Sequence, residues 1–173
     1  MRGRCIVNDT TLTDKLAQMQ RLLHDIEAGQ GAESMILHQN LNLVLRDGDG
    51  NIKQEQTIHN LITTAGKNRL LDATTGFSIK TFAYIAIGTG ATAAAIGDTT
   101  LLTEVARSIS TISNPSANTY QAQFTFAAGT GTGAITESGL LDAASVGNLL
   151  AHQVFSVINK LAADTLQITW SIT

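Results

Sequence analysis

Apolar and polar residues alternate along this chain in two successive patterns, first with the period of a helix and then with the period of a β-strand. Near the N-terminus, apolar residues recur at spacings of four, three, four and three: Leu12, Leu16, Met19, Leu23 and Ile26. This is the a/d repeat of a coiled coil, so we expect a helix over about residues 11–28 that packs along this seam. Gly29 and Gly31 end the pattern. Residues 1–34 are therefore expected to form a helical arm followed by a flexible linker.

The seam is short, because it extends over only about two heptads and coiled coils generally need three or more. Its partners must therefore be held close by something else. We expect other copies of the chain to supply them in a homotrimer, although the a and d residues alone do not determine the number of helices. The alternative is that the helix packs on the β domain of its own chain.

From about residue 35 the apolar residues follow the two-residue period of strands. Turn signals separate these runs; Asp47–Asn51, for example, reads Asp-Gly-Asp-Gly-Asn and predicts a hairpin. One short helix or turn is expected over residues 64–72. The seven or eight expected strands lie within residues 37–45, 53–58, 81–87, 102–112, 120–126, 135–141, 149–157 and 166–172. The pattern predicts an all-β domain over residues 35–173, an antiparallel β-sandwich or barrel-like fold preceded by the N-terminal α-helix.

The composition narrows the classes of function. Of the 173 residues, only 14% are charged and the formal net charge is −3, so no basic face for nucleic acid is expected. The single cysteine, Cys5, excludes an internal disulfide and a cysteine metal cage. The sequence shows no secretory leader and no membrane-length apolar run, and we therefore expect assembly in a host cytoplasm without a membrane partner.

The candidate chemistry of the sequence is sparse. The Asp47–Asn51 segment begins like a calcium loop, but Ile52 and Ile58 stand where an EF-hand needs glycine and glutamate. The histidines show no metal-ligand spacing, and His38 and His152 alternate with apolar residues, so both are expected to face outward. Glu137 lies among apolar strand residues and is expected to be a buried, hydrogen-bonded structural carboxylate. The sequence thus predicts no catalytic, cofactor-binding or metal-binding residues.

Several motifs resemble small structural proteins of tailed-bacteriophage virions. Residues 59–68 resemble a segment "N-x-hydrophobic-T-x-x-G" of those proteins. Residues 84–90 (YIAIGTG), 98–101 (DTTL) and 104–107 (EVAR) are similar to their stretch "YIALGTG … DTAL … EVAR". Residues 135–142 (ITESGLLD) resemble their "ITEaGLFd", with Leu141 in place of the usual phenylalanine. Phe155, Lys160 and the closing residues 164–170 complete a similarity that spans about residues 36–173.

The resemblance implies a non-enzymatic virion protein. The first expectation is a capsid cement or decoration protein that stabilises the head by bridging subunits of the major capsid protein. Because the "ITE-GLFD" pattern also resembles tail-fibre modules, a tail, baseplate or tail-fibre adaptor is the alternative. A carbohydrate-binding β module ranks last, because Trp170 and Tyr120 lie in apparent core registers and sugar sites want exposed aromatic residues.

Overall fold

Ten strands and one helix are described by this computed structural model, which covers residues 37–59, 61–76 and 80–173. The seam residues Leu12, Leu16, Met19, Leu23 and Ile26, with the whole 1–34 arm, lie outside these residues. The elements are β1 (Gln39–Arg46), β2 (Ile52–His59), β3 (Leu61–Ile62), α2 (Thr64–Thr75), β4 (Tyr84–Gly88), β5 (Glu104–Ile109), β6 (Thr111–Ser113), β7 (Tyr120–Phe126), β8 (Gly133–Leu141), β9 (Leu149–Lys160) and β10 (Thr165–Ile172).

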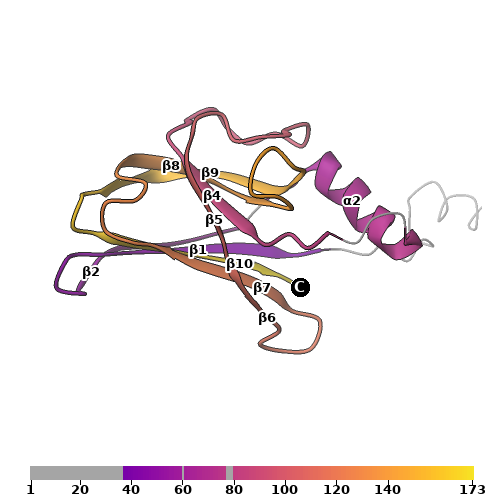
Figure 1. Ribbon diagram of the computed structural model, residues 1–173, viewed down its shortest axis with the longest axis horizontal. Coiled ribbons are helices and arrows are strands. Elements are labelled where there is room, and N and C mark those ends of the chain that lie inside the picture. Colours follow the sequence, from indigo (N-terminus) through magenta and orange to yellow (C-terminus); the bar gives the residue numbers. More distant parts are fainter. Residues whose placement is uncertain (1–36, 60, 77–79) are drawn as a thin grey trace, which may run out of the picture. The chain divides into compact units, whose positions relative to one another are not determined.

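The strands form two antiparallel sheets of five strands each, with the orders β2-β1-β10-β7-β6 and β3-β9-β8-β4-β5. We call them sheet A and sheet B. In Figure 1 the two sheets form two layers, and α2 lies at one end of sheet B, next to β9. The predicted all-β class is therefore confirmed, and the described domain is a β-sandwich-like fold.

The sheets are joined along both edges, because an edge strand of each continues into an edge strand of the other. β2 of sheet A leads into β3 of sheet B, and β5 of sheet B leads into β6 of sheet A, a crossing that is visible in Figure 1. At the second crossing Ser110 turns the chain, and its backbone N–H and its hydroxyl both donate to the carbonyl oxygen of Ala83, each at 2.7 Å. These crossings connect the two sheets through the chain, but each sheet stays open, with β2 and β6 as the edge strands of sheet A and β3 and β5 as those of sheet B.

The core lies between the sheets and follows the predicted alternation. Leu41, Leu43 and Leu45 of β1 are buried, and they lie opposite Trp170, Ile168 and Leu166 of β10 in the ladder. β10 ends one residue before the C-terminus, yet it lies between β1 and β7, so its backbone is paired on both sides. Burying one large apolar side chain is worth about 1.5–3 kcal/mol, which explains why this alternation determines which face of each strand turns inward.

Two details of the predicted strands are wrong. The single strand expected within residues 102–112 is two strands, β5 and β6, in different sheets. In β9, strict alternation would place Val157 on the same face as the buried Phe155, but Val157 is 44% exposed. The β8–β9 register shifts between Ile135 and Glu137, and this irregularity changes the phase of the alternation within β9.

The expected short helix is α2, and Thr63 explains where it begins. The Thr63 hydroxyl oxygen accepts from the backbone N–H of Gly66 at 3.0 Å, which is an N-cap. Thr63 Oγ1 also donates to the carbonyl oxygen of Leu149, and the Thr63 N–H donates to the carbonyl oxygen of Leu150 at 3.0 Å. No helix in the described residues is both long enough and apolar enough to cross a membrane.

Candidate functional site

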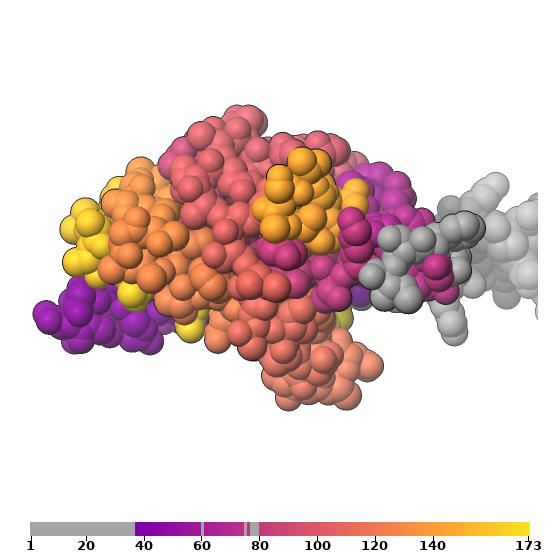
Figure 2. Space-filling model, in the orientation of Figure 1, coloured from indigo at the N-terminus to yellow at the C-terminus, as the bar shows by residue number. Residues whose placement is uncertain are grey.

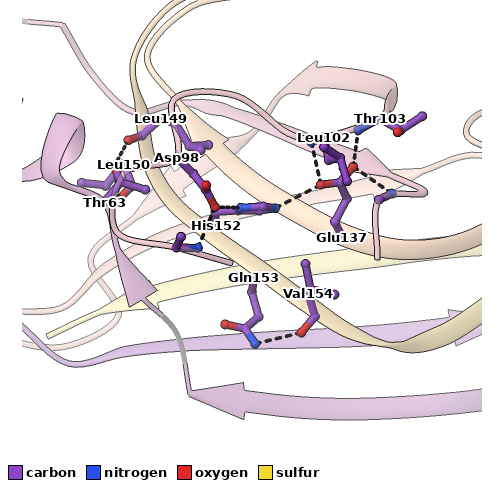
Figure 3. Close-up of polar contacts among 12 residues, drawn as sticks. Thr63, Asp98, Leu102, Thr103, Glu137, Leu149, Leu150, His152, Gln153 and Val154 are labelled. Atoms are coloured by element: carbon purple, nitrogen blue, oxygen red, sulfur yellow. Dashed lines mark hydrogen bonds and ion pairs between the residues drawn. The ribbon is translucent and has the colours of Figure 1, made fainter. Parts of the chain in front are cut away.

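His152 lies between two carboxylates on the outer side of sheet B. Its Nδ1 is 2.7 Å from Oδ2 of Asp98, and its Nε2 is 3.0 Å from Oε2 of Glu137 (Figure 3). The side chains of His152 and Glu137 are 3% and 0% exposed, and that of Asp98 is 28% exposed. His152 comes from β9 and Glu137 from β8, whereas Asp98 comes from the loop between β4 and β5. We call these three residues the His152 clamp.

Glu137 is held by backbone amides as well as by the imidazole. Its carboxylate accepts from the N–H groups of Gly90 at 3.0 Å, Leu102 at 2.9 Å and Thr103 at 2.7 Å. Burial alone would raise the pKa of Glu137, but these amides and His152 outweigh it and hold the pKa below its usual range. Glu137 is therefore an ionised carboxylate at neutral pH that fastens both ends of the 89–103 loop to β8.

Two glycines make room for this carboxylate. A Cβ on Gly88 would lie 2.4 Å from Oε1 of Glu137, and a Cβ on Gly90 would lie 2.6 Å from the same atom. Any larger residue at either position would displace the carboxylate from its amide donors. The Gly-Thr-Gly sequence at residues 88–90 thus has a steric role in the fold.

Asp98 completes the attachment of the loop. The pKa of Asp98 is lowered, because the N–H of Ala95 and the ring of His152 together outweigh the opposing effect of burial. Both ring nitrogens of His152 are therefore within hydrogen-bond distance of a carboxylate oxygen of this domain.

A pocket of about 310 Å³ lies beside the clamp. Asp98 and His152 reach its wall, and the rest of the lining comes from Thr92, Ala93, Gly97 and residues 99–102 of the same loop. Its two titratable groups already bind each other, so a ligand there would meet hydroxyls and backbone groups. In the described part of the chain, no cluster of three or more His, Cys, Asp or Glu residues has the arrangement of a metal site.

A second polar cluster ties the β8–β9 loop to α2. Asp142, whose side chain is fully buried, accepts from Nε of Arg69 at 3.2 Å and from the backbone and side-chain nitrogens of Asn148 at 2.7 and 2.8 Å. Burial opposes the ionisation of Asp142, but the hydrogen bonds from Asn148 and Arg69 lower its pKa overall. This cluster connects a loop to a helix and leaves the carboxylate no access to solvent.

A third cluster closes the β9–β10 turn. The buried Lys160 donates to the carbonyl oxygens of Ala127 at 2.9 Å and Asp164 at 2.7 Å. The side chain of Asp164 in turn binds Nζ of Lys53 at 2.7 Å and the N–H of Leu161 at 2.9 Å. Each of the three clusters therefore uses its charged groups to hold loops against the sheets.

The sequence predicted part of this site. Glu137 is the buried, hydrogen-bonded carboxylate that its neighbours indicated, and His38 is exposed as expected. His152 does lie on the outer side of sheet B, but it is buried, because the 89–103 loop covers it: Asp98 contacts its Nδ1, and Leu101 packs over the neighbouring Gly139, where a Cβ would lie 2.5 Å from Leu101 Cδ1. In the sequence, Asp98 is marked only as the first residue of the DTTL motif. Its distance of 54 residues from His152 gave no sequence signal.

The motif segments meet around the clamp. YIAIGTG supplies Gly88 and Gly90, DTTL supplies Asp98, and ITESGLLD supplies Glu137 and Asp142. No protein-family model, curated protein or solved structure matches the chain.

Proposed function

We propose that this protein is a non-enzymatic structural component of a tailed-phage virion, most plainly a capsid cement or decoration protein. The observation that carries the proposal is that the charged residues gathered in the motifs bind loops of the same domain. Because these charged side chains are occupied by contacts within the domain, we infer that the protein works by binding other proteins through its surface. The resemblance of residues 36–173 to virion modules indicates that these other proteins are components of a virion.

The proposed mechanism is mechanical. The domain would lie across joints between subunits of the major capsid protein and add buried contact area there, which raises the free energy needed to separate the subunits. The tied loops suit this role, since a surface that is already ordered loses little conformational entropy when it binds. The seam from Leu12 to Ile26 would join copies as a trimer, so that several modest contacts act together.

A tail, baseplate or tail-fibre adaptor is the second candidate, because the ITESGLLD motif resembles tail-fibre modules as well. In that case the helical arm would dock into the tail and the β domain would carry a further protein. The carbohydrate-binding alternative is disfavoured by two aromatic residues. Trp170 is fully buried, and Tyr120 donates its hydroxyl to the carbonyl oxygen of Phe82, with burial raising its pKa to about 12.

Counting copies in purified particles tests the proposal. Quantitative mass spectrometry would compare this chain with the major capsid protein in virions whose genome encodes it. A copy number of the same order as the coat subunits supports the cement protein, and a number matching the few-fold symmetry of a tail supports the adaptor. Absence from particles that package DNA normally would contradict both.

A further inference from the structure

β5 is an edge strand whose outer side has no partner strand among the described residues. Two large apolar residues of β5 are exposed, Val105 at 43% and Ile109 at 61%, and Leu102, in the loop just before the strand, is 61% exposed. Figure 2 shows the face on which this part of the chain, in salmon, lies against the orange loop that follows β8. An unpaired strand edge with apolar side chains is a template for pairing with another strand.

The edge on the opposite side of the sandwich is protected. β2 carries charged residues along its length, and Gln54 and Gln56 donate to the carbonyl oxygens of Val157 at 3.3 Å and Ser156 at 2.9 Å in β9. β3 is only two residues long. Short or charged edges are how natural sheets avoid pairing with each other. β5 carries two exposed large apolar residues, Val105 and Ile109, whereas β2 carries one, Ile52 at 53%.

Residues 102–109 read as a palindrome in chemical type. The first half is Leu-Thr-Glu-Val and the second half is Ala-Arg-Ser-Ile. Read from its end, the second half has an aliphatic, a hydroxyl, a charged and an aliphatic residue, as the first half does, with arginine in place of glutamate. If two copies align antiparallel about an axis between Val105 and Ala106, Glu104 of each copy meets Arg107 of the other. Leu102 then faces Ile109, and Thr103 faces Ser108. A two-fold interface requires this kind of self-complementarity.

A bulge makes this register possible. In a regular strand, Glu104 and Arg107 would point to opposite faces, because side chains alternate. Here Val105 is an extra residue: Glu104 lies opposite Gly88, Ala106 opposite Ile87 and Arg107 opposite Ala86. Glu104 and Arg107 consequently share the outer face, where they form a two-bonded ion pair at 2.6 and 2.9 Å.

We propose that β5 pairs antiparallel with β5 of a second copy of this chain, which joins the two B sheets into one continuous sheet. The two Glu104–Arg107 pairs then form a four-charge network across the two-fold axis. Nη1 of Arg107 donates to the carbonyl oxygens of Ala143 at 2.9 Å and Val146 at 2.8 Å, which fixes the guanidinium on the outer face; its side chain is 9% exposed and that of Glu104 is 32% exposed. This contact goes beyond the proposed function and does not depend on it.

Charge reversal in the full-length chain tests the pairing, with Leu16→Asp and Leu23→Asp present so that the seam does not contribute. This double variant, the parent of the variants below, should form dimers in analytical ultracentrifugation as its concentration rises. Glu104→Arg and Arg107→Glu should each weaken the dimer by about tenfold or more, since like charges then meet twice. An equal mixture of the two variants should dimerise again, because each supplies the charges that the other lacks.

Two further variants keep the test decisive. Ile109→Asp leaves the Glu104–Arg107 pair intact and should also give monomers. Glu55→Arg reverses an exposed charge on β2 and should leave the dimer unchanged, and circular dichroism confirms that each variant is folded. A parent that is monomeric at every concentration overturns the proposal, as do variants whose mixture fails to recover dimers. The same holds if, in a monomer, the amides of β5 that point away from β4 are protected from hydrogen exchange, because another segment of the same chain would then cover this edge.

Discussion

At the scale of single residues, the motifs of this chain are explained by packing and hydrogen bonding. Glu137 binds three amides and an imidazole, and Gly88 and Gly90 leave room for it. The identity of Glu137 as a structural carboxylate was predictable from its apolar neighbours. The partnership with His152 was not, because it depends on the pairing of β8 with β9 and on the path of the 89–103 loop, which no sequence pattern indicates.

Replacing Glu137 by glutamine should destabilise the domain by about 3 kcal/mol, because one carboxylate oxygen becomes an NH2 group, which cannot accept from the backbone amides that now donate to that oxygen. Urea unfolding followed by circular dichroism measures the change. The control is Glu55→Gln, whose side chain is exposed and which should change stability by less than about 0.5 kcal/mol. A Glu137→Gln variant as stable as the parent would show that the clamp does not hold the loop.

Gly66 provides a steric test of the T-x-x-G segment. A Cβ at this position would lie 2.6 Å from both Cα and the carbonyl oxygen of Leu150, so Gly66→Ala should push α2 off β9 and cost about 1–3 kcal/mol. Gly97→Ala is the matched control, since a Cβ there meets nothing within 4 Å. Equal thermal midpoints for the two variants would contradict the close approach of α2 to β9.

At the scale of elements, the alternation of apolar and polar residues predicted where the strands lie. It did not predict which strands pair with each other or which residues of each strand face the core. The hairpin at Asp47–Asn51 is present as predicted. The side chain of Asp47 accepts from the N–H of Asn51 at 2.8 Å, and Gly50 takes a positive φ of 89°. The division of residues 102–112 into β5 and β6 was not predictable, because both halves suit a strand and only the bend at Ser110 assigns them to different sheets. The phase change within β9 likewise depends on its pairing with β8.

The helical seam is the element whose role stays a prediction. Leu16→Asp together with Leu23→Asp would place carboxylates in the a positions and should abolish the predicted trimer while the β-sheet circular dichroism remains. Light scattering of the full-length protein reports the mass; the species left would be the monomer, or the β5-paired dimer at high concentration. An unchanged mass would indicate that the helix packs on its own domain.

At the scale of the whole molecule, the domain is two sheets joined at both edges and held at its loops by three buried ionic clusters. Asp98, Glu137 and Asp142 all have a lowered pKa in the folded state, so each binds a proton more readily when unfolded. Their contribution to stability is complete above the ordinary carboxyl pKa of about 4 and is lost as the pH falls through the lowered values.

The stability of the domain should therefore decline on acidification below about pH 4–5 and change less between that range and neutrality. Urea midpoints across a pH series measure this dependence. Glu137→Gln should reduce the slope of the acid limb, because one of the groups that take up protons on unfolding is gone. Parallel acid limbs for variant and parent would contradict the assignment of Glu137 as an ionised group in the folded protein.

The central claim is that this chain works as part of a larger particle, and cryo-electron microscopy of virions whose genome encodes it tests that most directly. The account predicts density for the two-sheet domain in repeated copies across joints between coat subunits, or at the tail if the adaptor role holds. Intact particles without such density at either place, together with protein found only free in solution, would contradict it.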